Sequence, residues 1–241
     1  MMRYLFLIFM FIETIHLQAQ KEYTTARLDL KGKVKSVTEV SLLKYPPELS
    51  TTKMIVVVPI TYHFDPKGNL VEKNIGNDIV YCYEYDAHNH LKGGKRISYP
   101  DKGEETAISF LYDKAGTYLV EKVGESESTT YRYFGTHTQI SYTSYTVKGR
   151  TTIENDIYYK DNGQVDYTLQ GDIKSVYHYD NKGQITDIEV YNLKGTKLLH
   201  YHYKYTYDDK GNWIEREEIF EKPVPKDRFP EIVHREITYY D

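Results

Sequence analysis

Hydrophobic and polar residues alternate along most of the chain. In one such stretch, residues 200–207, tyrosines at every second position share one face of an extended segment: Tyr201, Tyr203, Tyr205 and Tyr207. A two-residue period is that of a strand with one buried face. No segment combines a 3.6-residue period with helix caps. We therefore predict an all-β protein with very little helix.

A repeated motif marks the ends of these predicted strands. Its core reads Tyr-x-Tyr-Asp-x-x-Gly, and seven aligned copies place the Asp position at 65, 86, 113, 134, 160, 180 and 208, with the Asp lost at 134 and shifted at 160. The distances from 65 to 113, 113 to 160 and 160 to 208 are 48, 47 and 48 residues. Internal repeats of this length indicate stacked supersecondary units with a shared core. The predicted unit is two hairpins, repeated three times.

Each copy predicts a hairpin turn. The Asp side chain accepts hydrogen bonds from backbone amides that follow it, and the Gly three residues later takes a left-handed conformation. Asn89 holds the glycine position of its copy, and Asn tolerates a positive φ better than other non-glycine residues. The turn residues predicted on this basis are Asp65, Gly68, Asp113, Gly116, Asp180, Gly183, Asp208 and Gly211.

At these repeats the sequence resembles the YD-repeat, or Rhs-like, family, and Tyr-Thr-Tyr-Asp-Asp-Lys-Gly-Asn at 205–212 matches best. Residues 30–37, Leu-Lys-Gly-Lys-Val-Lys-Ser-Val, and residues 235–240, Arg-Glu-Ile-Thr-Tyr-Tyr, also resemble small exported repeat proteins of the Bacteroidetes type. The resemblance covers residues 28–241. It implies an antiparallel meander of β-hairpins in a curved sheet, either open or partly closed, and it carries over no catalytic residue.

The first residues predict export. Arg3, an apolar run from Tyr4 to Ile12 and the small residue Ala19 follow the order of a secretory signal peptide, assigned to residues 1–20. No segment is long and apolar enough for a membrane span. We expect residues 21–60 to form N-terminal strands continuous with the sheet, with a hairpin over 28–37. Residues 61–241 hold the repeats and form a single domain with 21–60. The expected location is periplasmic, outer-surface or secreted.

Charge and cysteine content limit the classes of function. The 241 residues include 31 basic and 35 acidic side chains, a net charge of −4, without the basic patch that a nucleic-acid partner requires. Cys82 is the only cysteine, which excludes an intrachain disulfide and leaves open whether it is free or pairs between molecules. Tyrosine outnumbers phenylalanine by 26 to 8. Tyrosine suits a half-buried strand surface, because its ring packs while its hydroxyl reaches water or a partner.

The tyrosine stripe is the feature with most functional content. It forms either a cross-strand ladder that buries one face of the sheet or an aromatic platform that binds a glycan or an extended peptide. The two interpretations overlap, because only one face of a sheet needs covering. The predicted platform residues are Tyr177, Tyr179, Tyr201, Tyr203, Tyr205 and Tyr207.

Metal sites have weaker support. The pairs His88 with His90 and His200 with His202 put two rings on one strand face, but no nearby Cys or dense carboxylate cluster completes a ligand set. The Asp-x-x-Gly-Asn turns lack the alternating acids and final Glu of an EF-hand calcium loop. We expect neither a metal nor a cofactor.

An enzyme is the rival class. The carboxylates that follow the turns, Glu72, Asp187 and Glu215, can supply the acid pair of a glycoside hydrolase. Their recurrence in each unit favours a structural role instead, so no catalytic residue is assigned. The prediction is a non-enzymatic exported protein that presents a tyrosine-rich β-surface to a glycan or protein partner. The alternatives are a carboxylate-dependent glycan hydrolase and a small accessory or immunity partner of an Rhs-type system.

Overall fold

The computed structural model describes residues 24–44, 54–99, 103–112, 118–134, 140–147, 150–162, 164–221 and 229–241. A four-residue 3-10 helix, Thr25–Leu28, precedes the first strand. Within these residues no helix has the length and apolarity to cross a membrane. The strands are β1 Val34–Lys44, β2 Met54–Val56, β3 Ile60–Phe64, β4 Leu70–Ile75, β5 Ile79–Tyr85, β6 Leu91–Ser98, β7 Glu104–Tyr112, β8 Tyr118–Val123, β9 Glu127–Phe134, β10 Ile140–Val147, β11 Arg150–Tyr159, β12 Val165–Gln170, β13 Ile173–Tyr179, β14 Ile185–Asn192, β15 Lys197–Tyr207, β16 Trp213–Phe220 and β17 Glu231–Tyr239.

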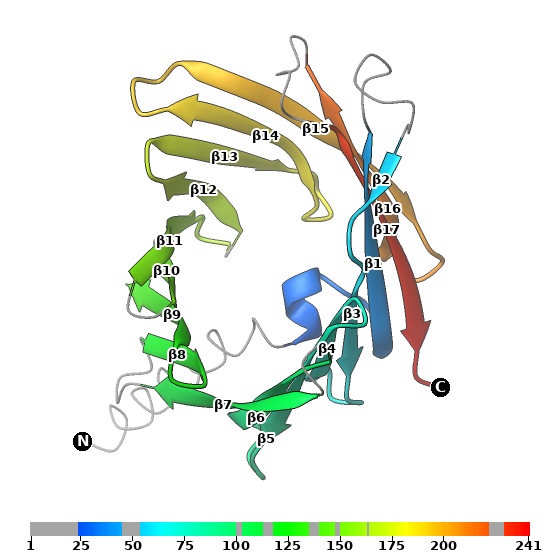
Figure 1. The fold of residues 1–241 in the computed structure, drawn as a ribbon. Coiled ribbons are helices and arrows are strands. Elements are labelled where there is room, and N and C mark those ends of the chain that lie inside the picture. The colour runs from blue at the N-terminus through cyan, green and yellow to red at the C-terminus, as the bar shows by residue number, and fades with distance from the viewer. Residues whose placement is uncertain are drawn as a thin grey trace, which may run out of the picture.

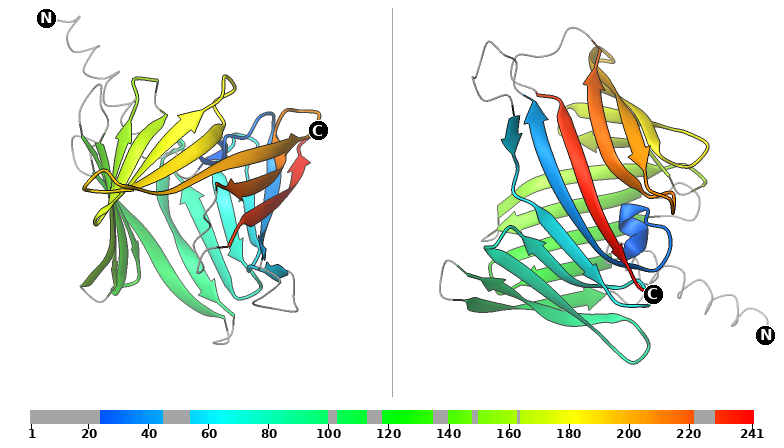
Figure 2. Two further views of the ribbon diagram at one scale, coloured as in Figure 1. Left: turned by 90° about the horizontal axis from the view of Figure 1, so that it is seen from above. Right: turned by 90° about the vertical axis from the view of Figure 1, so that its right-hand side faces the viewer.

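The strands form one antiparallel meander, which confirms the predicted fold class. Each strand from β3 to β17 pairs with the next one along the chain. Strand β1 lies between β17 and β3 and pairs with both, while the short β2 pairs with the end of β1 (Figure 2). The pairings therefore run round the molecule through β1, and the sheet curves into a ring (Figure 1).

Antiparallel order places every second connection at the same edge of the ring. Connections 65–69, 86–90, 160–164, 180–184 and 208–212 share one edge, which we call the turn edge. Connections 76–78, 171–172 and 193–196 lie at the opposite, far edge. The sequence repeat thus returns to the turn edge after every two strands, and two hairpins make a four-strand unit.

The Asp turns at the turn edge share one hydrogen-bond pattern. One carboxylate oxygen accepts the backbone N–H groups of the second and fourth residues after the Asp, at 2.8–3.0 Å in the turns of Asp65, Asp86, Asp180 and Asp208. The third residue has a positive φ in each, with values of 87°, 68°, 86° and 79° for Gly68, Asn89, Gly183 and Gly211. Asp113 and Gly116 lie outside the described residues.

The N-terminal segment differs from expectation, because residues 28–37 form no hairpin. The 3-10 helix ends at Leu28 and is followed by Asp29, whose φ is 51°, and Gly32 at φ 79° redirects the chain into β1. Ahead of β1, the only bridge to the sheet in the described residues joins Thr24 to Asn69. The hairpin prediction was wrong because it paired the two flanks of Gly32 with each other. In the structure β1 pairs with strands that are distant in the sequence.

Most of the buried hydrophobic side chains form two clusters on the inner face of the ring. Leu28 and Leu30, from the segment that lies inside the ring, pack against the larger cluster (Figure 1). The larger cluster comprises Val34, Val37, Tyr62, Phe64, Leu70, Tyr83, Leu91, Ile108, Phe110, Leu119 and Val123. The smaller comprises Ile188, Val190 and Tyr201, with Tyr177, Leu199, Tyr203 and Phe220 among the half-buried residues around it.

Candidate functional site: the inner tyrosine row

The tyrosines of β15 form a continuous row on one face of the strand. Successive ring centroids lie 5.7 Å apart from Tyr201 to Tyr203, 6.2 Å from Tyr203 to Tyr205 and 6.1 Å from Tyr205 to Tyr207. We call these four residues the tyrosine row. The row follows directly from the alternating sequence, since residues two apart in a strand share a face.

Strand register extends this surface sideways. Tyr177 of β13 lies opposite Ile188, Ile188 opposite Tyr201, and Tyr201 opposite Phe220. These four positions make a line across β13, β14, β15 and β16 on the face of the tyrosine row. The rings of Tyr201 and Phe220 are 5.4 Å apart. The structure therefore brings Tyr177 onto the same face as the row, two strands away.

Tyr179 lies further along β13, at the turn edge. The Lys160 ammonium lies 5.0 Å from the centre of its ring, and burial raises the pKa of Tyr179 to about 12. A cation above the ring covers one face of it. The Lys182 ammonium lies at the same distance, 5.0 Å, from the ring centre of Tyr207 in the row.

Burial divides the row into a packed end and a more open part. Tyr201 is only 6% exposed and packs with Ile188 and Val190, so it belongs to the core. The other three tyrosines are half-buried. The Tyr205 hydroxyl donates a 2.8 Å hydrogen bond to the Ile185 carbonyl. Burial raises the pKa of Tyr205 to about 12 and that of Tyr203 further still, so both phenols stay neutral at physiological pH.

Trp213 and two arginines complete the surface. The Trp213 ring centre lies 6.0 Å from that of Tyr205. The Arg216 guanidinium lies 4.8 Å from the Tyr203 ring centre, and that of Arg235 lies 3.3 Å from the Trp213 ring centre. Cations over aromatic faces are attracted by the ring quadrupole. Sequence reasoning missed all three residues; the only signal is their place on strands that pair next to the row.

Both arginines are paired with carboxylates. Arg216 lies 3.4 Å from Glu231, and Arg235 lies 2.8 Å from Glu39. The Arg235 side chain is only 4% exposed, and burial lowers its pKa while Glu39 opposes that shift. A buried ion pair of this kind holds its partners in place, because losing one leaves the other charge uncompensated. Around the row, therefore, the arginine charges are already balanced.

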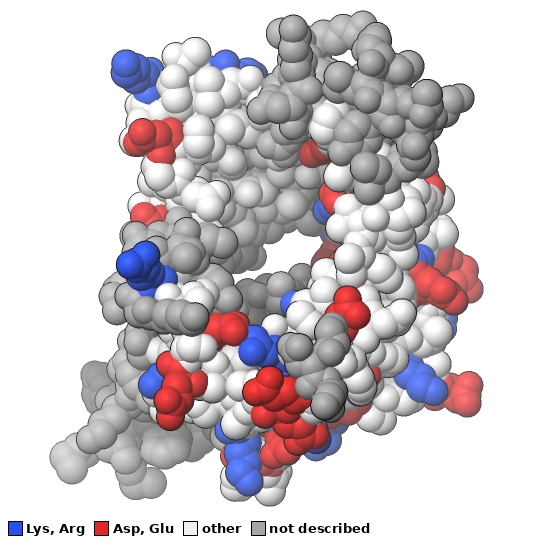
Figure 3. Space-filling model, in the orientation of Figure 1, with Lys and Arg blue, Asp and Glu red and all other residues white. Residues whose placement is uncertain are grey.

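The row faces the interior of the ring. Arg235, which contacts Trp213 beside the row, also donates a 3.3 Å hydrogen bond to the Leu28 carbonyl. Leu28 belongs to the short 3-10 helix, which lies inside the ring (Figure 1). The space-filling view shows a hollow at the centre of the molecule in the same orientation (Figure 3). The row is thus part of the concave surface.

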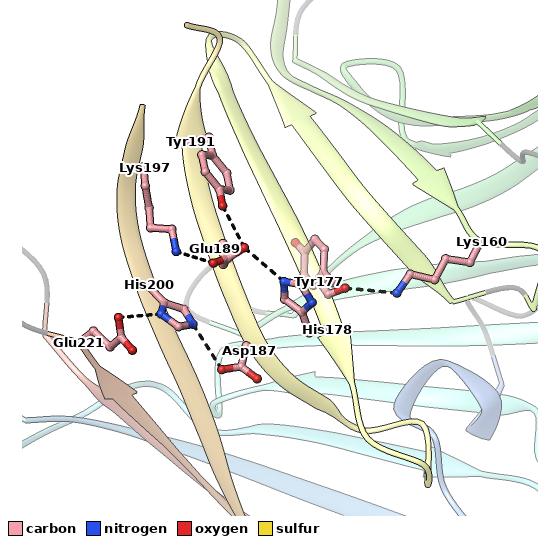
Figure 4. Close-up of polar contacts among 9 residues, drawn as sticks. All are labelled: Lys160, Tyr177, His178, Asp187, Glu189, Tyr191, Lys197, His200 and Glu221. Carbon is pink, nitrogen blue, oxygen red and sulfur yellow. Dashed lines mark hydrogen bonds and ion pairs between the residues drawn. The ribbon is translucent and has the colours of Figure 1, made fainter. Parts of the chain in front are cut away.

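The opposite face of β13, β14 and β15 carries a polar network (Figure 4). Glu189 accepts a 2.9 Å hydrogen bond from the Tyr191 hydroxyl, lies 3.3 Å from His178 Nε2 and pairs with Lys197. The hydrogen bonds from Lys197 and then Tyr191 lower the pKa of Glu189 to about 2. An anion with this many donors stays charged down to strongly acidic pH.

His200 lies in the same network between two carboxylates. Its Nε2 is 3.3 Å from Asp187 and its Nδ1 is 2.8 Å from Glu221 (Figure 4). A similar cross-strand pairing joins Glu72 to His63 at 3.7 Å and Glu215 to His234 at 3.3 Å. The three carboxylates considered for hydrolysis each pair with a histidine of a neighbouring strand, rather than with one another.

The histidine pairs form no ligand set. The rings of His88 and His90 are 6.2 Å apart on an exposed turn, where His90 lies 3.3 Å from Asp86. Across the described residues, no group of three or more His, Cys, Asp or Glu side chains is placed to hold a metal ion. The inner aromatic surface, with its row of contacting rings and flanking arginines, is therefore the best-supported candidate functional site.

Comparisons with known proteins leave the family open. No protein-family model matches the chain, and no curated protein matches its sequence. A porin-like protein from Bacteroides uniformis is similar in structure, with a TM-score of 0.40, 9% identity, and coverage of 87% of this chain and 98% of that one. A porin-like protein from Bacteroides vulgatus gives a TM-score of 0.36, 14% identity, and coverage of 86% and 98%. A chain of the Photorhabdus luminescens Tc holotoxin pore gives 0.22 and 11% identity, covering 67% of this chain and 11% of that one.

Proposed function

We propose that the protein is an exported, non-enzymatic binding protein that holds a neutral glycan against the inner tyrosine row. The row itself carries the proposal. The rings of Tyr203, Tyr205 and Tyr207 are in contact with one another, half-buried and neutral, and they line the concave side of a ring with a central hollow (Figure 3). Aromatic side chains with a few fixed polar groups are the usual lining of small-molecule sites.

The inner position favours a slender ligand over a folded protein. A protein partner needs roughly 800 Å² on each side for a stable interface, and the row lies within the curvature of the sheet. A glycan chain is narrow enough to enter, its apolar faces pack on aromatic rings, and its hydroxyls can bond the phenols.

The charge balance favours a neutral glycan over an acidic one. The two arginines beside the row, Arg216 and Arg235, are already paired with Glu231 and Glu39. Recognising a carboxylate or sulfate on the ligand through either arginine would require breaking one of these pairs. The expected hydrogen-bonding groups are instead tyrosine hydroxyls.

The single tryptophan provides the assay. Trp213 lies 6.0 Å from Tyr205, so a ligand on the row is expected to change its fluorescence. A panel of neutral and acidic oligosaccharides is titrated into the full protein, and any hit is then tested for hydrolysis over a day. Binding of a neutral glycan without turnover supports the proposal. Turnover would make the protein an enzyme, and an acidic glycan as the only ligand would refute the charge argument.

Variants locate the binding surface. Tyr203→Ala removes a half-buried ring from the centre of the row, and we expect it to weaken glycan binding at least tenfold. Tyr99→Ala is the matched control, because Tyr99 is 54% exposed and lies near the far edge, away from the row. Equal losses in both variants, or none in Tyr203→Ala, would place the ligand elsewhere.

A further inference from the structure

Residues 24–31, which we call the latch segment, are held by turns rather than by strand pairing. The Thr25 N–H donates a 2.9 Å hydrogen bond to the Gly68 carbonyl. At the other end of the segment, the Lys31 N–H donates to Asn212 Oδ1 at 2.6 Å, and Asn212 Nδ2 donates to the Lys31 carbonyl at 2.9 Å. Asn212 thus binds both backbone groups of one latch residue, as a neighbouring strand would.

Gln184 holds the middle of the latch segment. Its side-chain amide donates a hydrogen bond to the Asp29 carboxylate. Gln184 and Asn212 occupy the same place in their repeats, directly after the turn glycine, and they are only 8% and 2% exposed. Buried amides need hydrogen-bond partners to offset the loss of water. For these two side chains the latch segment supplies partners.

The three anchor points lie on turns that are far apart along the chain. They belong to the connections β3–β4, β13–β14 and β15–β16, all at the turn edge. The latch segment crosses the inside of the ring between them (Figure 1). It therefore ties together parts of the sheet that do not pair directly.

Arg235 connects the latch segment to the tyrosine row. Its guanidinium donates to the Leu28 carbonyl at 3.3 Å and to Glu39 at 2.8 Å, and it lies 3.3 Å from the Trp213 ring centre. Movement of Leu28 away from Arg235 would remove one of the contacts that fix the guanidinium over Trp213. The Arg235 side chain thus contacts both the latch segment and the aromatic surface.

We propose that residues 24–31 act as a releasable latch, whose binding to the turns of Gly68, Gln184 and Asn212 is coupled through Arg235 to Trp213 and the tyrosine row. Release of the latch segment removes the packing of Leu28 and Leu30 on the larger cluster, but within the described residues it breaks only the bridge from Thr24 to Asn69 and none of the strand pairings. Segments with few ladder hydrogen bonds are the ones that open locally, below the free energy of global unfolding. The device does not depend on which ligand the row binds.

Hydrogen exchange on the full protein tests the latch. Gln184→Ala removes the amide that binds Asp29 but keeps the backbone bond of residue 184 to Asp180. We expect exchange in the peptide covering 24–31 to accelerate at least tenfold, with β15 and β16 unchanged and a shift in Trp213 emission. His90→Ala is the matched control, since His90 holds the same turn position and bonds its own Asp86. We expect it to change neither signal.

A reversible crosslink provides the second measurement. A Cβ atom built at Gly68 lies 4.0 Å from the Thr25 Cβ, within the range of a disulfide. The test protein carries Thr25→Cys, Gly68→Cys and Gln184→Ala in a Cys82→Ser background. Hydrogen exchange at residues 24–31 should be slow when the disulfide is oxidised and fast when it is reduced. Trp213 emission should change between the same two states. Comparing the two redox states of one protein removes the strain at residue 68.

Two results would overturn the proposal. One is unchanged exchange at 24–31 in Gln184→Ala, or acceleration of all strands together, which would make the segment part of the cooperative sheet. The other is Trp213 emission that is the same in both redox states of the crosslink, although hydrogen exchange at 24–31 differs between them. In that case the latch opens but is not coupled to the row.

Discussion

Asp208 is a turn aspartate that also bonds a tyrosine of the distant strand β17, and we expect its removal to be costly. One carboxylate oxygen accepts the N–H groups of Lys210 at 3.0 Å and Asn212 at 2.8 Å, and the other accepts the Tyr239 hydroxyl. Asp208→Ala removes both acceptor oxygens and all three hydrogen bonds. It leaves the Asn212 amide and the phenol of β17 half-buried without their charged partner.

The expected loss follows from the burial of these donors. A hydrogen bond to a charged group contributes about 1.5–3 kcal/mol, but an exposed donor recovers most of this from water. The bond from the Lys210 amide is exposed, while those from the Asn212 amide and the Tyr239 hydroxyl are part-buried. We therefore expect about 2–4 kcal/mol of destabilisation in all. For a chain of this size, 3 kcal/mol corresponds to a fall in Tm of roughly 6–12 °C.

The pH dependence of the free energy of unfolding provides a second test of this prediction. Burial alone would raise the pKa of Asp208, but hydrogen bonds from Tyr239 and from the backbone of Asn212, Lys210 and Gly211 outweigh it and lower the pKa. A lowered pKa means that the carboxylate stabilises the fold above about pH 4, the usual aspartate value, and that this stability is lost as the pH falls. The gap between wild type and Asp208→Ala should be widest at neutral pH and narrow in acid.

Urea unfolding followed by Trp213 fluorescence measures the effect, because Trp213 starts the strand that leaves the turn. Asp209→Ala is the control: it removes an exposed carboxylate from the same turn and should change stability by less than about 0.5 kcal/mol. Asp208→Asn should fall between the two, since Asn192 accepts the equivalent backbone bonds at 3.0 and 2.9 Å. Equal unfolding midpoints for Asp208→Ala and Asp209→Ala would refute the turn-anchor reasoning.

Three further predictions concern the backbone and the outer face. Gly94→Ala should lower stability by about 3 kcal/mol or more, measured by thermal unfolding, because its Cβ would lie 2.0 Å from the Cys82 carbonyl oxygen. Gly183→Ala should cost about 1–2 kcal/mol by urea unfolding because φ is 86°, and Gly183→Asn less, as Asn89 shows. Glu189→Gln should remove the part of the acid-induced stability loss that spans about pH 4.3 down to the folded pKa of about 2.

Each of these has its own control. For Gly94, the comparison is Gly93→Ala, which should cost less because its methyl would lie 3.2 Å from the nearest atom, the Ile108 carbonyl oxygen. For Gly183, equal losses in the Ala and Asn variants would show that the positive φ is not the cause. For Glu189, acid titrations of wild type and Glu189→Gln that run parallel below pH 4 would show that its network adds no stability.

Much of the fold could be predicted because the information is local. The turns need an acceptor, a residue with positive φ and five residues of chain, and all of these appear within the copies of Asp65, Asp86, Asp180 and Asp208. Asn89 illustrates this, since its φ of 68° matches the role assigned to it from sequence alone. The alternation of Tyr203 and Tyr205 with Lys204 likewise fixes a face without knowledge of any partner strand.

The remainder depends on contacts between residues far apart in the chain. Asn212 and Lys31 are separated by 181 positions, and Arg235 and Glu39 by 196. No period or motif links such residues. Their encounter depends on β1 pairing with both β17 and β3, which brings the ends of the repeat array together. The latch segment and the arginines beside the row were invisible for the same reason.

The position after the turn glycine shows how this long-range structure acts on the repeat. In two turns that residue is a buried amide that bonds residues 24–31, Gln184 or Asn212, whereas the exposed His90 bonds its own Asp86. Asn69 is buried as well, but its amide bonds its own turn and the next one. In each of these four turns the fifth residue closes the hairpin through its backbone, so its side chain is free to differ. The amides of Gln184 and Asn212 thus add long-range contacts to a turn whose geometry does not need them.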